Sequence, residues 1–175
     1  MIPFCHNEFG LQGQRIALRN LLPTDVNSRY LSWLLDKDIN RLMAPNLPTK
    51  LSELRQYYRR IKSSKDAMIF AIVLIKNNKH IGNVTLQHIN MKERSATFGL
   101  LIGDKKYWNK GYGKEATNLV LSYGFFILGL QKVFGPASYH HKVSLKLLRG
   151  LRFKVGRRTK ERIWFQMEIG DFLKG

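Results

Sequence analysis

The sequence predicts a single α+β domain, an α/β arrangement built on one mixed β-sheet. Short segments of alternating or continuous apolar residues indicate strands, and longer segments with a helical period indicate helices. Their order is strand, helix, helix, three strands, loop, helix, strand, helix and two strands, which is typical of a mixed sheet flanked by helices. No internal repeat or long linker divides the chain, so we expect one domain over residues 1–175.

The composition indicates a folded and strongly basic protein. Of 175 residues 44% are hydrophobic, which excludes a disordered polyelectrolyte, and 30 Lys and Arg against 12 Asp and Glu give a net charge of +18. One cysteine, Cys5, excludes a disulfide scaffold and an all-cysteine metal site. The longest apolar run, residues 67–75, is shorter than the ~20 residues that span a bilayer, and residues 1–10 lack a signal-peptide pattern. We therefore expect a cytoplasmic protein with no membrane partner.

The first third of the chain predicts one strand and two helices. Alternation predicts the strand over residues 14–18. Pro23-Thr24-Asp25 is a helix start signal, and a second helix is expected to begin near Thr49, after Pro45 and Pro48. The residues expected on the buried sides recur at helical spacing: Val26, Tyr30, Trp33 and Leu34 in the first helix, and Leu51, Leu54, Tyr58 and Ile61 in the second.

The middle of the chain predicts an antiparallel meander of three strands. Residues 68–75, 80–89 and 96–102 are apolar or alternating segments, and polar turns at 76–79 and 90–94 separate them. Consecutive strands joined by short turns pair most simply as neighbours.

The last third predicts helices over residues 114–128 and 143–151, and strands over 131–136, 153–155 and 163–169. Gly129 stands where a helix C-cap is expected. The apolar residues expected to share a buried helix face are Ala116, Leu119, Val120, Tyr123 and Ile127, and then Val143, Leu147 and Leu151, and Phe126 is expected in the core.

The segment from Ile102 to Ala116 carries the most informative chemistry. A strand ends there, a Gly- and Lys-rich loop follows, and a helix opens on Gly113 and Lys114. Glycines at 111 and 113 let successive amides turn inward at the positive end of the helix, where they bind phosphate oxygens. Neither the Walker loop nor the dinucleotide fingerprint fits the spacing. The alternative is a glycine-rich turn with solvated lysines, but the flanking strand and helix favour a pyrophosphate site.

Residues 107–116, Tyr-Trp-Asn-Lys-Gly-Tyr-Gly-Lys-Glu-Ala, resemble the signature of the GNAT superfamily of N-acetyltransferases, in its RimJ/RimL-like branch. Weaker similarities lie at residues 15–19 with Asp25, at 30–36 and at 81–84. The resemblance implies a mixed central sheet of about six or seven strands flanked by about four helices. It also implies that the sheet splays between its fourth and fifth strands, here residues 96–102 and 131–136.

The same resemblance implies acetyl-CoA as the co-substrate and no metal. In the family the loop holds the pyrophosphate, the strand before it pairs with the pantetheine arm, and a basic residue on the later helix meets the 3′-phosphate. The cofactor-binding residues that this implies here are Leu101, Ile102, Trp108, Asn109, Lys110, Gly111, Tyr112, Gly113, Lys114 and Lys146.

The segment from His141 to Ser144 resembles the family's Asn-x-x-Ser, with histidine in place of asparagine. The resemblance implies Ser144 as the proton donor to the departing thiolate, although a serine there also suits an N-cap. Leu148 occupies the position where many GNAT enzymes have a tyrosine. Thr97 replaces the acid that is common in the branch, so Glu161 and His141 are the candidate bases for the attacking amine.

Half of the excess positive charge lies between Lys132 and Arg162, where ten Lys and Arg accompany one acid, Glu161. This charge favours an anionic partner, such as a nucleotide sugar or RNA near a protein substrate, over a polyamine, and the alternative is a basic surface that serves only solubility. We expect acetyl-CoA-dependent N-acetylation of a primary amine, on a nucleotide sugar or a ribosomal or other protein N-terminus, by a monomer or homodimer. The acceptor loops are expected near residues 36–50 and 156–162. The alternatives are a basic nucleic-acid-binding protein and a GNAT-fold CoA binder without turnover.

Overall fold

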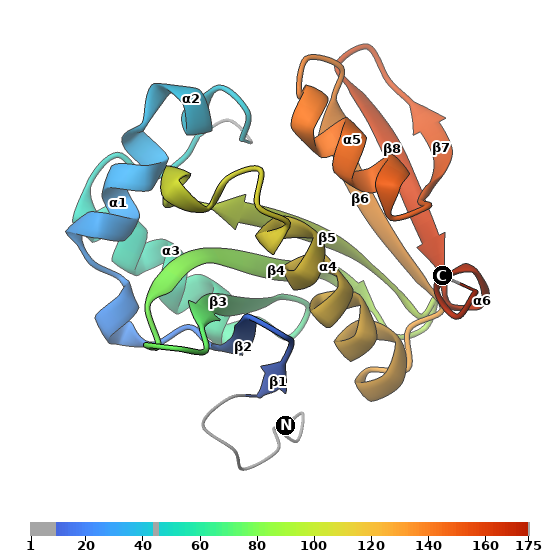
Figure 1. Ribbon diagram of the computed structural model, residues 1–175, viewed down its shortest axis with the longest axis horizontal. Coiled ribbons are helices and arrows are strands. Elements are labelled where there is room, and N and C mark those ends of the chain that lie inside the picture. The colour runs from blue at the N-terminus through green and yellow to red at the C-terminus, as the bar shows by residue number, and fades with distance from the viewer. Residues whose placement is uncertain (1–9, 44–45, 175) are drawn as a thin grey trace.

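The computed structural model shows one eight-stranded sheet in the order β1-β2-β3-β4-β5-β6-β8-β7 (Figure 1). It describes residues 10–43 and 46–174, so the predictions that concern Cys5, Pro45 and the first nine residues fall outside the described residues. Neighbouring strands are antiparallel except β5 and β6, which are parallel. The predicted mixed sheet is confirmed, and the two-residue strand β1 (Leu11–Gln12) adds one strand to the predicted number.

The N-terminal helices begin where polar side chains bind their free amides. The Asn27 side chain accepts hydrogen bonds from the amides of Arg29 and Tyr30, and the Asp36 side chain caps the next helix in the same way. The predicted first helix is therefore divided into three short elements. The elements are β2 (Ile16–Asn20), η1 (Pro23–Asp25), α1 (Ser28–Leu35), α2 (Lys37–Asn40) and α3 (Leu51–Ser63).

The predicted meander is confirmed as β3 (Met68–Leu74), β4 (His80–Asn90) and β5 (Ser95–Ile102). Its central strands approach so closely that one position excludes a side chain. A Cβ atom at Gly82 would lie 2.1 Å from the carbonyl oxygen of Leu101. Glycine at position 82 therefore permits β4 to lie against the strand that leads into the loop.

Helix α4 (Tyr112–Ser122) begins two residues earlier than predicted and continues into a π-helix, η3 (Tyr123–Ile127). In η3 the amide of Leu128 donates to the carbonyl oxygen of Tyr123, 3.1 Å away. The wider turn directs Phe126 and Ile127 outward, where they are 55% and 51% exposed, so their predicted burial is wrong. Phe125 is buried instead. The C-cap is Leu128, one residue before the predicted position, and the chain leaves the helix at Gly129, whose φ of 68° is the left-handed conformation that commonly follows a helix.

The C-terminal part consists of β6 (Lys132–Ser138), α5 (Lys142–Gly150), β7 (Lys154–Arg158), β8 (Arg162–Glu168) and α6 (Ile169–Phe172). Val143 was expected on the buried side of the later helix, but it is 59% exposed. Leu148 is buried instead, because that side of α5 packs against Gly135 of β6. The helix is present as predicted, with its apolar side rotated.

The helices cover the two faces of the sheet in separate groups (Figure 1). Helices α1, α2 and α3 contribute to one buried cluster with residues of β2 and β3, which includes Trp33 as predicted. Helices α4 and α5 contribute to a second cluster on the opposite face, with residues of every strand from β2 to β6 and of β8. Within the described ranges no helix is long and apolar enough to cross a membrane.

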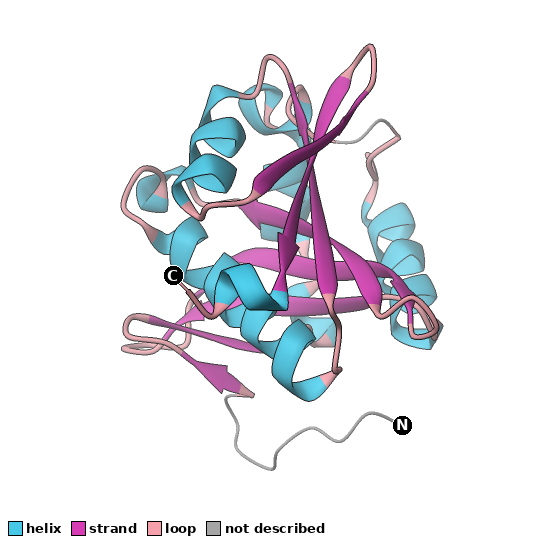
Figure 2. Cartoon of the chain, turned by 90° about the vertical axis from the view of Figure 1, so that its right-hand side faces the viewer, coloured by secondary structure: helices cyan, strands magenta, loops and turns pink. Residues whose placement is uncertain are grey.

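The sheet splays between β5 and β6, as expected. Pairing is confined to Ser95, Ala96 and Thr97, which lie opposite Lys132 to Phe134. Figure 2 shows β6, β7 and β8 running steeply across the direction of the other strands. Because β5 continues to Ile102 without β6 beside it, the edge of β5 between residues 98 and 102 is open.

Candidate active site

The turn between β5 and α4 presents unpaired amides. After the 3-10 helix η2 (Lys105–Tyr107), Asn109 and Gly111 adopt positive φ values of 56° and 83°. Gly111 is the N-cap of α4, and its carbonyl oxygen accepts the amide of Glu115 at 3.1 Å. In the described part of the chain, no group accepts a hydrogen bond from the amides of residues 109–114. Amides at a helix N-terminus bind phosphate oxygens, so this turn fits a diphosphate.

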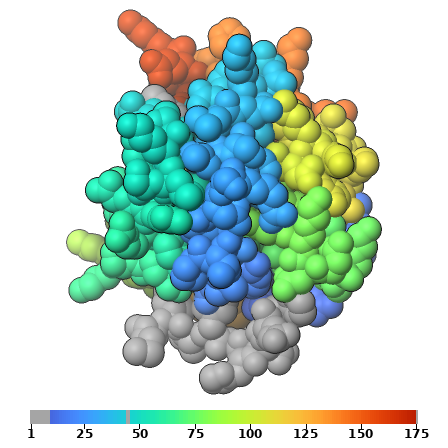
Figure 3. All heavy atoms as spheres, turned by 90° about the vertical axis from the view of Figure 1, so that its left-hand side faces the viewer, coloured from blue at the N-terminus to red at the C-terminus, as the bar shows by residue number. Residues whose placement is uncertain are grey.

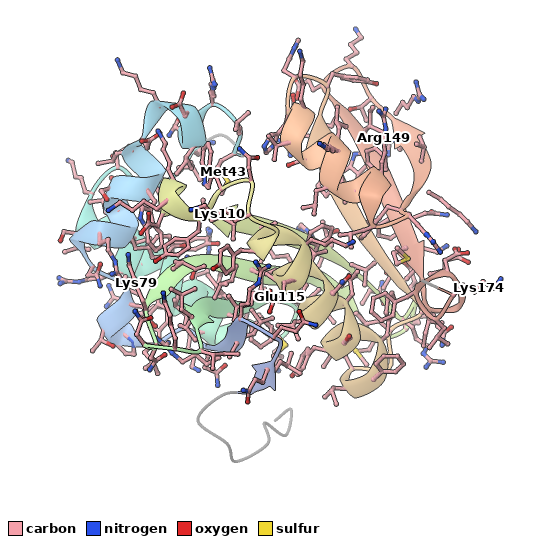
Figure 4. The ribbon with its side chains drawn as sticks, in the orientation of Figure 1. Met43, Lys79, Lys110, Glu115, Arg149 and Lys174 are labelled. Atoms are coloured by element: carbon pink, nitrogen blue, oxygen red, sulfur yellow. The ribbon has the colours of Figure 1, made fainter. Side chains whose placement is uncertain are left out.

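An ion pair between residues far apart in sequence fixes the start of α4. Glu115 accepts hydrogen bonds from the amides of Arg15 at 2.7 Å and Ile16 at 3.2 Å, and from Nε of Arg15 at 3.0 Å. The same guanidinium donates through Nη1 to the carbonyl oxygen of Lys110 at 2.8 Å. It also lies over the ring of Tyr112, 4.4 Å from the centroid. Arg15, the residue before β2, thus contacts both sides of the amide turn, where Figure 4 shows Lys110 in the loop and Glu115 on the helix.

The carboxyl group of Glu115 is ionised under this arrangement. Burial alone would raise its pKa, but the hydrogen bonds from the amides of Arg15 and Ile16 and from the Arg15 guanidinium hold the pKa below its ordinary value. A Cβ atom at Gly111 would lie 3.1 Å from Nη2 of Arg15. The turn therefore combines a left-handed backbone with a close side chain, and only glycine satisfies both conditions without strain.

The part of the loop that follows β5 is held by Trp108 and Lys105. Nε1 of Trp108 donates to the carbonyl oxygen of Ile102 at 2.7 Å, so this side chain fixes the loop to β5. The ammonium group of Lys105 lies 2.7 Å from a carboxylate oxygen of Asp36 and 2.9 Å from one of Asp38. Figure 3 shows the loop (yellow) beside the α1–α2 segment (blue).

The hydrogen bonds between β5 and β4 show which main-chain groups of β5 face its open edge. Ile102 lies opposite Gly82, and the amide of Gly103 donates to the carbonyl oxygen of Ile81 at 2.9 Å. In an antiparallel ladder this places Ile102 and Gly82 in a non-hydrogen-bonded pair. The main-chain groups of Ile102 are therefore directed away from β4, and its carbonyl oxygen already accepts the indole of Trp108.

The β6 side of the same strand agrees with this assignment. The carbonyl oxygen of Arg94 accepts the amides of Gln131 at 2.6 Å and Lys132 at 3.2 Å, so even-numbered residues face β6. Beyond the paired region, the main chain of Leu100 faces the gap, whereas that of Leu101 faces β4. The strand-like pairing predicted for the pantetheine arm is thus available at Leu100 and Ile102 rather than at Leu101.

Helix α5 brings His141 and Ser144 together. Oγ of Ser144 lies 2.8 Å from Nδ1 and 3.3 Å from Nε2 of His141, and both side chains are half-buried. Burial lowers the pKa of the His141 imidazole. His141 is the N-cap residue and Ser144 is the third residue of the helix, so the N-cap role considered for Ser144 is wrong. Leu148 follows one turn later and is buried.

The remaining predicted residues lie on the surface. Lys146 is exposed on α5 and lines a shallow depression with Lys142, Leu145, Arg149 and Gly150. Figure 4 places Arg149 on this helix and Lys110 in the loop, on the two sides of the splay.

The second candidate base lies apart from these groups. Glu161 is exposed in the turn between β7 and β8 and forms no hydrogen bond or ion pair with another described residue. The structure thus brings Ser144 and His141 together but leaves Glu161 without a contact to either.

Residues 15–154, which make up most of the chain, match the family model of the Acetyltransferase (GNAT) domain. The chain belongs to the GNAT acetyltransferase family. It is therefore an N-acetyltransferase, and the family's co-substrate is acetyl-CoA.

Curated relatives agree with this assignment. The chain is 25% identical over 147 residues to the uncharacterized N-acetyltransferase p20 of Bacillus licheniformis, with 82% of each chain covered. It is 24% identical over 157 residues to the human alpha/beta-tubulin-N-acetyltransferase 9, covering 82% of this chain and 74% of the human protein.

Solved GNAT structures share the fold. An acetyltransferase of Bacillus anthracis superposes with a TM-score of 0.79 at 18% identity, over 90% of this chain and 97% of that one. The spermidine/spermine N-acetyltransferase of Vibrio cholerae superposes with a TM-score of 0.76 at 19% identity, over 91% and 97%. At these identities the likeness concerns the fold.

Two residues of this GNAT site were missed as site residues from the sequence. Arg15 and Glu115 were quoted only as parts of the resemblance, although together they shape the amide turn. Their separation of 100 residues hides the contact. The available signal was a pair of opposite charges in two segments that both resemble the family.

Proposed function

We propose that this GNAT enzyme acetylates a primary amine on an uncharged or anionic acceptor. The acceptor class is the amino terminus of a protein or the amino group of a nucleotide-linked sugar, as in the RimJ/RimL-like branch that the signature resembles. The observation that carries the proposal is a half-buried face of the sheet beside the splay, on which the described residues offer no unpaired carboxylate.

This face can be derived from the pairing of β5, β6 and β8. Alternate residues of these strands are buried in the cluster that contains α4 and α5, so their neighbours point the other way. Thr97 pairs with Phe134, and Pro136 pairs with Trp164. All four side chains are half-buried, and Gly99, next on β5 in the same direction, is exposed. An acceptor can approach the open edge of β5 over this face.

The charges of this face do not suit a polycation. Among its described residues the carboxylate is that of Glu168, which lies 3.3 Å from the ammonium group of Lys132. Thr97, at the position where the branch commonly has an acid, is neutral. A polyamine needs carboxylates to replace its water shell, whereas a nucleotide or an acidic peptide does not.

The α1–α2 segment offers no free carboxylate either. Lys105 pairs with Asp36 and Asp38, and its hydrogen bond is the largest cause that lowers the pKa of Asp36. The Vibrio cholerae neighbour acts on spermidine and spermine. In this chain Asp36 and Asp38 are paired with Lys105, and Asp38 also with Arg41, which supports a different acceptor.

The chemistry needs a neutral amine, a proton for the departing thiolate and a donor for the oxygen that gains charge. We assign the proton donor role to Ser144, because Leu148 at the usual tyrosine position has no proton to give. Glu161 and His141 are the candidate bases, and Glu161, which forms no hydrogen bond with another described residue, would act through water. Holding the acetyl group and the amine together supplies much of the remaining acceleration.

The proposal is tested by an acceptor panel with free thiol release as the readout. The panel contains an acidic peptide with a free amino terminus, the same peptide with a blocked terminus, a nucleotide-linked amino sugar and spermidine. We expect kcat/KM for the free peptide or the amino sugar to exceed that for spermidine at least tenfold, and no release with the blocked peptide. A preference for spermidine would contradict the proposed acceptor class.

A further inference from the structure

We propose that Thr85 and Gln87 of β4 hold the acceptor beside the open edge of β5, and that this acceptor is the amino terminus of a protein. The Thr85 hydroxyl binds the first peptide carbonyl oxygen, and the side-chain oxygen of Gln87 binds an N–H of the amine. The proposal rests on the proposed function, since it concerns the acceptor of that reaction. It goes further because it assigns the acceptor site to named side chains and chooses one acceptor class.

Both residues lie on the face of the sheet over which the acceptor approaches. In the pairing of β4 with β5, Thr85 lies opposite Gly99 and Gln87 lies opposite Thr97. Side chains of directly paired residues share one face of a sheet, so Thr85 and Gln87 are on the face to which Thr97 belongs. Gly99 precedes Leu100, whose main chain faces the gap. An amine held over Gly99 is therefore about 3.4 Å along the strand from the expected place of the pantetheine arm.

Gly99 opens this face onto the hydroxyl of Thr85. A Cβ atom built on Gly99 would lie 2.8 Å from Oγ1 of Thr85 and would meet no other described atom within 4 Å beyond its neighbours in the chain. Gly99 is exposed, whereas Thr85 is only 7% exposed, so the hydroxyl is reached through the space that the glycine leaves. The backbone does not itself require glycine here, because the φ of Gly99 is not positive.

A hydrogen bond between the two side chains leaves one donor and one acceptor free. Nε2 of Gln87 donates to Oγ1 of Thr85 at 3.2 Å, so the threonine oxygen acts as an acceptor and its own hydrogen stays available. Oε1 of Gln87 has no hydrogen-bond partner among the described residues and is not buried. Since Oε1 and Nε2 belong to one amide, the free hydroxyl hydrogen and the free oxygen lie next to each other over the same face.

A donor beside an acceptor matches the first residue of a protein. Its amino group gives an N–H, and its nearby carbonyl oxygen accepts the hydroxyl hydrogen. The nitrogens of spermidine are protonated at physiological pH and only donate, so the Thr85 hydrogen would lose its bond to water without a replacement. Across the gap, Phe134 pairs with Thr97, and the parallel direction of β6 brings Pro136 to the level of Gly99. These apolar side chains suit the first side chain of a peptide rather than the phosphates of a nucleotide sugar.

The neutral side chain of Gln87 also suits the reaction. The amine attacks only after it has lost a proton, and a carboxylate at this position would stabilise the ammonium form and oppose that loss. An amide oxygen binds the N–H of either form and favours the charged form less than a carboxylate does. With one N–H on Oε1 and the peptide carbonyl on Thr85, the nitrogen is held over the edge of β5, where its orientation lowers the barrier.

The first test uses the acidic peptide of the panel as acceptor. Thr85→Val removes the hydroxyl at nearly constant shape, and we expect kcat/KM for the peptide to fall about tenfold, while KM for acetyl-CoA stays within about twofold. Thr85→Ser keeps the hydroxyl and should retain at least about a third of the wild-type value. Gly99→Ala covers the hydroxyl and should match Thr85→Val. Gly170→Ala is its control, at an exposed glycine where a Cβ meets no atom within 4 Å.

The second test changes the acceptor preference. Gln87→Glu places a carboxylate beside the amine, so the ratio of kcat/KM for spermidine to that for the peptide should rise at least about tenfold. Gln12→Glu is the matched control, because it adds the same charge at an exposed position of β1, at the edge of the sheet away from the splay. This variant should keep the wild-type ratio within about twofold, since salt screens so distant a charge. A purely structural role for Gln87 would change the two acceptors alike.

The outcomes separate the acceptor site from the proposed function. An unchanged kcat/KM in folded Thr85→Val, or a Gln87→Glu ratio equal to that of Gln12→Glu, would overturn the acceptor site while the wild-type preference for the free peptide upholds the proposed function. A wild type that prefers the amino sugar to the peptide would overturn the protein terminus as acceptor in the same way. A wild-type preference for spermidine, or no thiol release with any acceptor, would refute the proposed function and the acceptor site with it.

Discussion

At the scale of single residues, the amide turn depends on side chains that never need to touch the ligand. Arg15 binds the carbonyl oxygen of Lys110 on one side of the turn and the carboxylate of Glu115 on the other. Gly111 supplies the left-handed backbone between them. The turn is therefore shaped before any phosphate arrives, which reduces the entropy lost on binding.

Gly111→Asp tests the turn at this scale. The new side chain strains a backbone with φ of 83° and adds negative charge beside the free amides, so acetyl-CoA affinity should fall at least tenfold. Isothermal calorimetry measures the affinity. Gly170→Asp is the control, because Gly170 is exposed and a Cβ there meets no atom within 4 Å. Unchanged affinity in a folded Gly111→Asp protein would count against the site.

At the scale of elements, the approach of β4 to β5 sets the strand that leads into the loop. Gly82→Ala would place a methyl group 2.1 Å from the carbonyl oxygen of Leu101, and main chain rather than a flexible side chain must move. We expect a loss of about 2–3 kcal/mol in the free energy of unfolding, measured with urea, as for overpacked cores. Gly170→Ala should change it by less than about 0.5 kcal/mol. If Gly82→Ala unfolded with the same free energy as Gly170→Ala, the close approach of β4 and β5 would not require glycine at position 82.

Helix α5 carries the prediction for the 3′-phosphate of coenzyme A. Lys146 is exposed beside Lys142 and Arg149, so Lys146→Ala should weaken binding of coenzyme A but leave binding of its 3′-dephospho form unchanged. The expected loss of coenzyme A affinity is roughly twofold to fivefold, the size of one exposed charge contact. Lys62→Ala on α3 is the control. Equal weakening of both ligands would place the 3′-phosphate elsewhere.

The elements show how far the sequence predicts this fold and site. Strands β3, β4 and β5 were predictable because each is a distinct apolar or alternating segment between polar turns. The π-helix η3 was not, because a five-residue hydrogen-bonded turn leaves no periodic signal, and Phe126 was misplaced for that reason.

The candidate site also has a part that the sequence predicts and a part that it does not. The amide turn follows from local sequence, namely two glycines before a helix. The pair of Arg15 with Glu115 and the direction of the Leu101 main chain depend on β-sheet register between distant segments, which a single sequence does not contain.

At the scale of the whole molecule, three buried or half-buried groups make stability dependent on pH. Burial would raise the pKa of Asp25, but Arg19, the Leu22 amide and His80 hold it below its ordinary value, as the contacts of Glu115 do for that residue. Burial lowers the pKa of His80 below 6.5. In each case the unfolded chain binds more protons than the folded chain as the pH falls, so acid favours unfolding.

The free energy of unfolding should therefore decline as the pH falls from 6.5, first through His80 and then, below 4.5, through the carboxylates. Glu115→Gln should cost about 1–2 kcal/mol at pH 7, because it weakens hydrogen bonds to a charged acceptor. The difference between variant and wild type should shrink as the pH falls below 4.5 and Glu115 takes up a proton. Urea unfolding at a series of pH values measures it, and a difference independent of pH would contradict the assigned ion pair.

The main-chain amides of residues 109–114 are the central feature of the assigned coenzyme site. A crystal structure with coenzyme A bound tests them directly. We expect the diphosphate oxygens within hydrogen-bonding distance of these amides and the pantetheine arm beside Leu100 and Ile102. Coenzyme A bound with its diphosphate at any other part of the chain would contradict this assignment.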